Sequence, residues 1–353
     1  MLYLSHNNDS EASMPVIDKL KSTIMAATVL ITGVTGFIGS RVALEVLQAG
    51  YRARLSIRHP EQAEKLRRIF SSHLSKIEFT VVSDITVTGC FDEALQDVQY
   101  VIHVASPLPD RNSDLLIPAM QGTTSILQSA SKYSTIRKVV VTSSISSFIP
   151  LAGQPHGTVI TEDTGIPYDA KQGISPLLDP MVQYRASKVA SYQAIIDFVQ
   201  EHKPSFDVTT FHPSWVYGRN PAQEPHDNLS GSCGALVLTL LSPERPINGQ
   251  FLGVHVDDVA AAHVKALGEC TRGFQSFLLS APRRSWEEVN AFVRHEYPSV
   301  AWRLIPEDWM NYAVDSSKAE KELGLKFKSM EDQVRDTVDQ QLEFGKLPVQ
   351  SVL

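Results

Sequence analysis

The sequence predicts an α/β fold in which a doubly wound parallel sheet is followed by a smaller C-terminal lobe. Short apolar runs rich in β-branched residues alternate with helical patterns from residue 28 to about residue 211, and this alternation is typical of βαβ units. One of these runs ends at a glycine, and two further glycines follow at three-residue spacing as a helical pattern begins. After His212, prolines and short segments replace the regular alternation, which indicates a separate lobe.

The first strand is expected over 28–32 and the first helix over about 36–49, with the glycines at their junction. In such a unit one glycine makes the turn, one lets a pyrophosphate approach the backbone, and one packs the helix against the strand. The unpaired N–H groups and the dipole of the helix N-terminus favour an anion there. The sequence therefore predicts a Rossmann-type dinucleotide site with these contacts: Gly33, Thr35, Gly36, Phe37, Ile38 and Gly39.

The end of the second strand, expected over 52–57, indicates which dinucleotide binds. NAD sites place a carboxylate about 20 residues after the glycines, where it binds the ribose 2′-hydroxyl. Positions 52–60 contain no acid; instead Arg58 ends the strand, and Lys65 lies in the helical segment beyond it. Cations at these positions favour a 2′-phosphate, so NADP(H) is the expected cofactor. Either cation alternatively belongs to a solvated charged surface.

The third and fourth strands, expected over 77–82 and 100–106, end in further candidate cofactor contacts. After the third strand, Asp84 either accepts from the adenine amino group, with Ile85 against the ring, or caps a helix. His103 lies inside the apolar fourth strand, which favours a hydrogen-bonded core histidine over a catalytic one. Small residues at the end of that strand leave room for a ligand; they are Val104, Ala105 and Ser106.

The strongest chemical signal is the pair Tyr184 and Lys188. A helix expected over 183–201 places residues i and i+4 on one face, so the phenol and the ammonium point into the same space. An ammonium fixed beside a phenol stabilises the phenolate, which suits a phenol to proton transfer near neutral pH. The fifth strand ends in two serines, and a hydroxyl there would polarise a carbonyl. Ser144 is the expected donor and Ser143 its alternative, because adjacent side chains point to opposite faces of a strand.

Together with the glycines, these residues make the chain resemble an extended short-chain dehydrogenase/reductase, in the branch of dihydroflavonol 4-reductase, cinnamoyl-CoA reductase and fungal aldehyde and ketone reductases. The resemblance covers about residues 27–345. The run Met181–Gln183 departs from the Asn-Trp pair that precedes the tyrosine in plant cinnamoyl-CoA reductases, which disfavours a CoA thioester substrate. The motifs that carry the resemblance are Thr32–Gly39, Asp84–Ile85, His103–Pro107, Pro118–Thr123, Thr142–Ser144, Tyr184–Lys188, His212–Gly218, His255–Val259 and Ser316–Gly324.

The resemblance implies an NADPH-dependent ketoreductase that converts a ketone or aldehyde to an alcohol, and it favours a role in fungal secondary metabolism. The nicotinamide would supply the hydride and Tyr184 the proton, with Lys188 tuning the phenol. Ser144 would hold the carbonyl oxygen. The same resemblance implies that Pro213 and Val216 line the cofactor site.

Apolar residues in the expected substrate-facing segments, such as Phe148, Trp215 and Leu236, favour a hydrophobic or aromatic carbonyl substrate. Ordinary core packing explains the same residues equally well. Two other functions are considered. A nucleotide-sugar epimerase or dehydratase would keep NAD tightly bound, and Arg58 speaks against it. A non-catalytic NADP(H)-sensing regulator would generally lack the tyrosine–lysine pair that this chain keeps.

Composition limits the partners of the protein. The 353-residue chain has a net charge of −7 and a sequence pI near 5.9, which argues against nucleic-acid binding. Its three cysteines are far apart in the sequence, so we expect a reducing compartment and no metal site. No apolar run approaches the roughly 20 residues of a membrane span. We therefore expect a cytoplasmic monomer or homodimer that binds a small molecule and no membrane.

The domain organisation follows from these patterns. The N-terminal segment lacks the basic-then-apolar plan of a secretory signal, so a disordered leader is expected, with Met25 as an alternative start. The expected units are a leader over 1–26, an NADP-binding domain mainly over 27–212, a substrate-binding lobe mainly over 213–345 with 253–270 returning to the Rossmann core, and a tail over 346–353.

Overall fold

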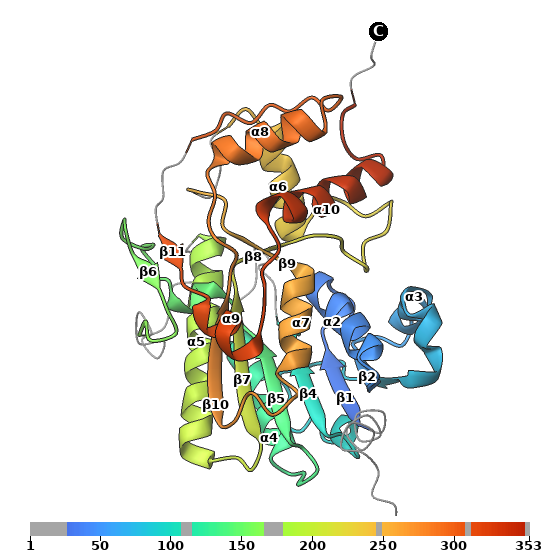
Figure 1. Cartoon of the computed structure of the whole chain (residues 1–353). Helices are drawn as coiled ribbons and strands as arrows, with labels where there is room; N and C mark the ends of the chain where they lie inside the picture. Colours follow the sequence, from blue (N-terminus) through green and yellow to red (C-terminus); the bar gives the residue numbers. More distant parts are fainter. Residues whose placement is uncertain (1–26, 107–114, 166–178, 245–248, 308–311, 350–353) are drawn as a thin grey trace, which may run out of the picture.

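The computed structural model describes residues 27–106, 115–165, 179–244, 249–307 and 312–349. The expected leader with Met25 lies outside these ranges, as do parts of the segments expected to face the substrate. Within them, the chain forms a seven-stranded sheet and a cluster of helices beyond the carboxyl ends of its strands (Figure 1).

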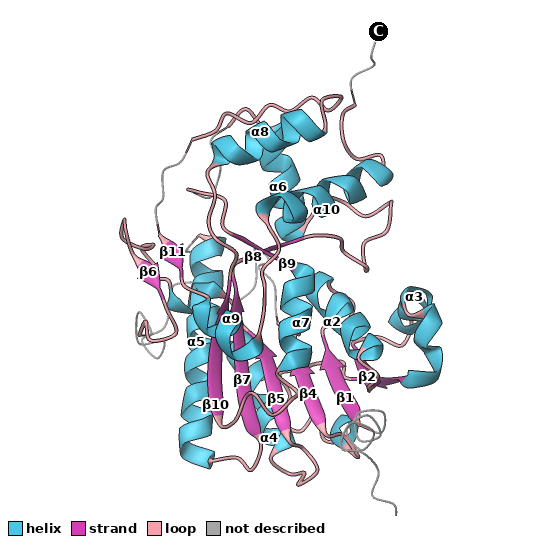
Figure 2. Cartoon of the chain, viewed as in Figure 1, coloured by secondary structure: helices cyan, strands magenta, loops and turns pink. Residues whose placement is uncertain are grey.

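The seven-stranded sheet has the order β10-β7-β5-β4-β1-β2-β3, and every neighbouring pair is parallel (Figure 2). The chain starts in the middle at β1, builds outward to β3, and then returns to β4 on the other side. This reversal confirms the predicted doubly wound fold, and it creates a crevice between β1 and β4. The strands are β1 (Thr28–Thr32), β2 (Arg52–Ile57), β3 (Ile77–Val81), β4 (Tyr100–His103), β5 (Lys138–Thr142), β7 (Asp207–Pro213) and β10 (Phe274–Leu279).

Helices cover both faces of this sheet, which is why its central strands are continuous apolar runs. In β1, Val29 and Ile31 pack into the core on one face, whereas Leu30 packs into the core on the other. Helices α2 and α7 pack together on the first face, and α4 and α5 pack together on the second. Their bounds are α2 (Phe37–Gln48), α4 (Leu116–Ala130), α5 (Pro180–His202) and α7 (Val256–Lys265).

Strand β10 was not predicted, because Gln275 and Ser276 interrupt its apolar pattern. It extends the sheet by pairing with β7, and α9 (Ser317–Leu323) packs beside it through Lys318, which donates to Gln275 Oε1 and the Ser276 carbonyl. Helix α7, in the segment 253–270, packs against one face of the sheet. Beyond this segment, β10 joins the sheet and α9 packs beside β10. We call β1–β5, β7, β10 and their flanking helices α2, α4, α5, α7 and α9 the sheet unit.

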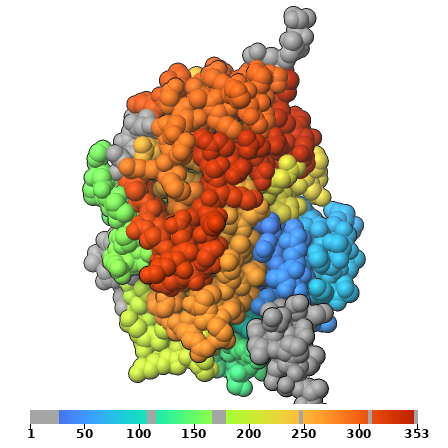
Figure 3. Space-filling model, in the orientation of Figure 1, coloured from blue at the N-terminus to red at the C-terminus, as the bar shows by residue number. Residues whose placement is uncertain are grey.

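The remaining C-terminal elements form a lobe with its own core. Strands β8 (Trp215–Tyr217) and β9 (Gly253–His255) pair in parallel, and the helices pack around buried Trp286. Leu347, in the expected tail, is buried in the same core. In the space-filling view, segments after residue 253 cover much of the visible face (Figure 3). The helices of the lobe are α6 (Gly231–Leu241), α8 (Trp286–Glu296) and α10 (Met330–Glu343).

Several boundaries differ from those expected. The fourth strand ends at His103 rather than 106, because the N–H groups of Val104 and Ala105 donate to the Thr32 hydroxyl instead of a neighbouring strand. Helix α5 starts three residues earlier than expected, at Pro180, because the Asp179 carboxylate caps it by accepting from the Met181 N–H. The smaller elements are α3 (Gln62–Ile69), η1 (Ser71–Lys76), η2 (Glu93–Leu95), η3 (Ile145–Phe148), and the paired strands β6 (Val159–Ile160) and β11 (Ala313–Val314).

Candidate active site

The glycine turn between β1 and α2 has the shape that a pyrophosphate needs. Gly33 has φ of 72°, and a Cβ there would lie 2.7 Å from the Ala105 nitrogen. A Cβ on Gly39 would overlap the Gly33 carbonyl oxygen. Gly36 is exposed and meets only that oxygen, at 3.4 Å. No side chain caps the N-terminus of α2 in this part of the structure, so the N–H groups of its first turn are available to an anion.

The predicted contacts between the three glycines lie at the mouth of this turn. Thr35 is exposed, and Phe37 and Ile38 begin α2 while packing partly against the sheet-unit core. The turn therefore combines a solvent-facing backbone with a fixed inner wall. Its glycines and open N-terminus fit a dinucleotide pyrophosphate.

Thr32 joins the two strands that flank the crevice. Its Oγ1 accepts from the backbone N–H groups of Val104 and Ala105, at 3.1 Å each, and lies 3.0 Å from His103 Nδ1. These bonds hold the end of β4 against the glycine turn and so shape the crevice. Sequence reasoning did not assign Thr32 a role, although its position directly before the first glycine was a usable signal.

The far side of the crevice carries the two predicted cations. Arg58 is exposed at the end of β2, and its backbone N–H donates to Gln62. Lys65 lies on α3, where its Nζ is 3.4 Å from Glu224 and 3.9 Å from Asp227. Both carboxylates belong to the loop that follows β8. An ion pair between α3 and the lobe was not expected from the sequence.

The Asp84 carboxylate caps a turn, whereas its two predicted roles were an adenine contact and a helix cap. It accepts from the backbone N–H and the hydroxyl of Thr86 at 2.8 and 2.7 Å. These hydrogen bonds, assisted by the charge of Arg58, lower the pKa of Asp84. Ile85 packs against α4 at Gly122, where a Cβ would come within 2.9 Å of the isoleucine side chain. Gly122 is therefore what lets the segment after β3 approach α4.

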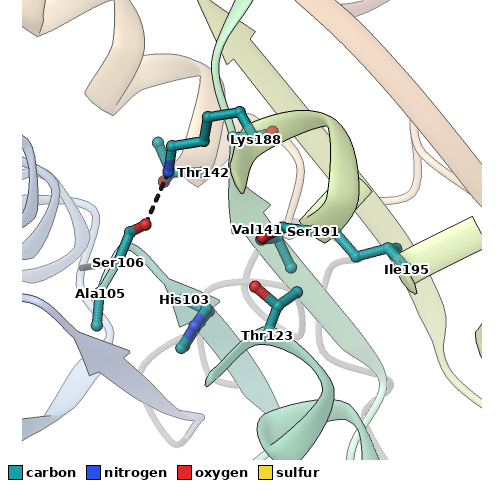
Figure 4. Close-up of a pocket in the computed structure, with 10 residues that line it drawn as sticks. His103, Ala105, Ser106, Thr123, Val141, Thr142, Lys188, Ser191 and Ile195 are labelled. Carbon is teal, nitrogen blue, oxygen red and sulfur yellow. Dashed lines mark hydrogen bonds between the residues drawn. The ribbon is translucent and has the colours of Figure 1, made fainter. Parts of the chain in front are cut away.

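Tyr184 and Lys188 lie one turn apart on α5. The Lys188 ammonium is 5.4 Å from the centre of the Tyr184 ring. Lys188 is buried, and its Nζ donates to the Ser106 hydroxyl at 2.8 Å (Figure 4). The structure thus brings the predicted pair together with the end of β4, at the same edge of the sheet as the glycine turn.

The two serines after β5, Ser143 and Ser144, form different hydrogen bonds. Ser147 Oγ donates to the Lys188 carbonyl at 3.2 Å, so its only proton is used there. Ser143 Oγ, at 2.9 Å, must then donate to Ser147. Ser144 Oγ accepts from the Ser146 N–H as an N-cap, and this bond leaves its own proton available to another acceptor.

A buried histidine behind these serines was missed by the sequence analysis. The Nδ1 of His212 lies 3.2 Å from the Ser144 carbonyl, and its Nε2 lies 2.9 Å from Thr210 Oγ1. Burial, together with the charge of Lys188, lowers the pKa of His212 to about 3. The ring is therefore neutral at physiological pH, and it positions the backbone of Ser144 from the neighbouring strand.

Pro213 and Val216 lie where the sheet unit meets the lobe. Pro213 ends β7 and is buried, and Val216 is buried in β8. Between them, Ser214 donates its N–H to the Leu279 carbonyl. This connection carries the chain from the carboxyl edge of the sheet directly into the lobe, so a ligand at that edge would meet both units.

Known proteins with similar sequences place the chain in a family of nucleotide-dependent enzymes. The model of the NAD dependent epimerase/dehydratase family matches residues 29–277. The ketoreductase sphI of Aspergillus fumigatus is 37% identical over 90% of this chain and 98% of its own length. The ketoreductase CTB6 of Cercospora beticola is 34% identical over 89% of this chain and 95% of its own length.

A solved structure agrees with these sequence matches. The yeast methylglyoxal/isovaleraldehyde reductase Gre2, complexed with NADPH, superposes with a TM-score of 0.78 and 28% identity, covering 90% of this chain and 99% of Gre2. None of the helices described here is both long and apolar enough to span a membrane. From its motifs, its sheet order and these matches, the chain belongs to the NAD dependent epimerase/dehydratase family, as an extended short-chain dehydrogenase/reductase.

Proposed function

We propose that this protein is an NADPH-dependent reductase that converts a ketone or aldehyde to an alcohol. The observation that carries the proposal is the Tyr184–Lys188 pair on α5, with Lys188 fixed by Ser106 at the edge of a glycine turn shaped for a dinucleotide. The ketoreductase names of the fungal relatives and the NADPH complex of Gre2 support the same reaction.

Tyr184, Lys188 and Ser144 each have a different role in the proposed reduction. NADPH, when bound, supplies a hydride to the carbonyl carbon. The Tyr184 phenol donates a proton to the carbonyl oxygen, and the Lys188 ammonium beside it stabilises the phenolate that results. The Ser144 proton, which its capping bond leaves available, donates to the same oxygen and stabilises the charge that develops there.

The choice of NADPH over NADH rests on the cations after β2. Arg58 and Lys65 lie after β2 on the outer side of the crevice, and positions 52–60 contain no carboxylate for a free ribose hydroxyl. The proposed substrate is a hydrophobic carbonyl compound, because Trp215, on β8 just beyond the carboxyl edge of the sheet, is only partly buried. Phe148 and Leu236, by contrast, are buried in hydrophobic cores and are not part of this argument. We further propose a role in secondary metabolism, as the family resemblance implies.

The proposal is tested by following NADPH oxidation with a panel of aldehydes and ketones. Wild-type protein should turn over a hydrophobic member of the panel. Tyr184→Phe should lower kcat by about 1,000-fold, because general-acid catalysis is lost while the ring remains. Unchanged turnover in this variant would refute the mechanism.

The assignment of the serine is tested by a matched pair of variants. Ser144→Ala should lower kcat by about 100-fold, as expected when one donor to a developing oxyanion is removed. Ser143→Ala should retain most of the activity, because the Ser143 proton is already used by Ser147. The reverse order of effects would make Ser143 the donor.

A further inference from the structure

A small polar cavity lies behind Lys188, between α4, α5 and the ends of β4 and β5. Its volume is about 10 Å³, which is close to the space that one water molecule occupies. His103, Thr123 and Ser191 line its inner part, and Lys188 and Ser106 lie at its other end (Figure 4). The cavity therefore adjoins the proposed catalytic pair without containing Tyr184.

The protonation of His103 follows from the hydrogen bonds of Thr32. The Thr32 hydroxyl oxygen already accepts two backbone N–H groups, so both of its lone pairs are used and its own proton donates to His103 Nδ1. His103 is fully buried, and burial with the charge of Lys188 lowers its pKa to about 4. The neutral ring thus carries its proton on Nε2.

This Nε2–H group needs an acceptor. The ring is 1% exposed, and Nε2 has no hydrogen-bond partner among the residues that the structure describes. A buried donor left without an acceptor is strongly unfavourable, and few are found in folded proteins. His103 lines the cavity, so the missing acceptor has a place there.

Two further hydroxyl groups of the cavity lining, those of Thr123 and Ser191, can only accept. Thr123 Oγ1 donates its proton to the Ala119 carbonyl at 2.9 Å. Ser191 Oγ donates its proton to the Ser187 carbonyl at 2.8 Å. Both oxygens therefore offer lone pairs to the cavity, whereas His103 and Lys188 offer N–H groups.

We infer that this cavity is a binding site for a single ordered water molecule, held by His103 and the hydroxyl oxygens of Thr123 and Ser191 and donated to by Lys188. Such a water accepts from two nitrogens and donates to two oxygens, so all four of its hydrogen bonds are satisfied. A metal cation does not suit the site, because the Lys188 ammonium and the His103 N–H both point positive charge into it.

The water gives His103 an indirect part in the reaction. Lys188 would be fixed from one side by Ser106 and from the other by the water, so that its ammonium is held beside the Tyr184 phenol. His103 is in this sense a positioning residue, which acts through the water and touches neither substrate nor cofactor. This second step depends on the proposed reductase function, whereas the water site itself does not.

The water site is tested by crystal structures of the whole protein and of two matched variants. Thr123→Val removes a cavity acceptor at nearly constant volume. Thr124→Val is the control, because its hydroxyl also donates to a carbonyl one turn back but lies outside the cavity lining. Wild type and Thr124→Val should show density for a water bonded to His103 Nε2, and Thr123→Val should lose it. A wild-type cavity without such density would overturn the inference.

The positioning role is tested by the pH profile of kcat in the same proteins. Thr123→Val should lower kcat by about fivefold and move the midpoint of its profile to higher pH, because a less restrained ammonium stabilises the phenolate less. Thr124→Val should match wild type. If Thr123→Val loses the water but keeps the wild-type profile, His103 has no positioning role. Failure of the reductase proposal would appear differently, as unchanged turnover in Tyr184→Phe.

Discussion

The sheet unit and the C-terminal lobe bury their polar groups in different ways. In the sheet unit, His103, His212 and His263 are fully buried and are hydrogen-bonded to neutral hydroxyls and carbonyls. Where the lobe meets the sheet unit, ion pairs occur: Asp257 on α7 binds Lys328 at 2.6 Å, and Lys65 on α3 lies 3.4 Å from Glu224. Neutral buried groups therefore surround the proposed active site, and partly exposed ion pairs hold the lobe against it.

This difference has a physical consequence for each region. A buried neutral hydrogen bond is insensitive to salt but is lost when its histidine must take up a proton. A partly exposed ion pair is screened by salt and contributes little to stability, typically below about 1 kcal/mol. The sheet unit should thus respond strongly to backbone changes and to acid, and the junction with the lobe should respond weakly to single charge changes.

The largest difference should come from two glycines, one in each region. A Cβ at Gly39 would come within 2.6 Å of the Gly33 carbonyl carbon, which is backbone and cannot move aside. A Cβ at Gly253 would overlap the end of the Gln333 side chain and lie 2.7 Å from the Tyr217 ring. Gly39→Ala should destabilise the protein by more than about 4 kcal/mol, and Gly253→Ala by about 1 to 3 kcal/mol.

Denaturant unfolding followed by circular dichroism measures both values. NADPH binding should be lost in Gly39→Ala, because the turn that the pyrophosphate needs cannot form. Gly253→Ala should still bind NADPH, since the glycine turn is unchanged. Equal destabilisation by the two substitutions would show that the glycine turn is no more constrained than the lobe.

The response to acid should be the next largest effect. Burial lowers the pKa of His103 and His263 to about 4 and that of His212 to about 3, against 6.5 for an unburied ring. Because the unfolded chain takes up protons at higher pH than the folded one, stability is complete above pH 6.5 and falls as the pH is lowered towards these values. Each ring should therefore remove about 1 kcal/mol between about pH 7.5 and pH 5.5.

A variant isolates the contribution of one ring. His263 donates from Nδ1 to the Val259 carbonyl and accepts from Thr142 at Nε2, and an amide side chain keeps a donor and an acceptor without titrating in this range. Between about pH 7.5 and pH 5.5, both proteins should lose free energy of unfolding. The loss should be smaller in His263→Asn than in wild type by about 1 kcal/mol. The lower stability of the variant at both pH values cancels in that difference. If His263→Asn and wild type lose the same free energy of unfolding between these pH values, His263 does not contribute to the acid sensitivity.

The same contrast explains how much the sequence alone could predict. The glycine turn, the cations after β2 and the Tyr184–Lys188 pair depend on residues close together in the chain, where spacing determines geometry. These features were predicted, as was the doubly wound sheet. Strand β10 was missed because it is specified by pairing with β7 rather than by its own pattern.

Contacts between segments that are distant in the chain also could not be predicted from the sequence. Thr32 and His103 meet only because β1 and β4 are neighbours in the sheet, and a single threonine before a glycine does not indicate which ring it will bind. The ion pair between Lys65 and Glu224 likewise requires the lobe to be placed against α3. Local motifs therefore predicted the candidate chemistry, and the fold supplied the groups that support it.

The smallest effect concerns this ion pair, which crosses from the sheet unit to the lobe. Glu224 lies 3.4 Å from Lys65 and 3.2 Å from Arg68, and the Lys65 side chain is 31% exposed. Lys65 is also a proposed partner of the cofactor 2′-phosphate, so the carboxylate competes with that phosphate for one ammonium. Glu224→Gln should therefore tighten NADPH binding by about two- to fivefold, the size expected for a partly exposed pair, and leave NADH binding unchanged.

Fluorescence titration with both cofactors measures this effect, and Glu343→Gln is the matched control. Glu343 pairs with Arg219 within the lobe, so its replacement by glutamine changes the net charge equally without removing an ion-pair partner of Lys65. If Glu224→Gln weakens NADPH binding instead, the carboxylate orients Lys65 for the phosphate rather than competing with it. If both variants tighten NADPH binding equally, the effect comes from net charge alone, and Lys65 does not contact the 2′-phosphate.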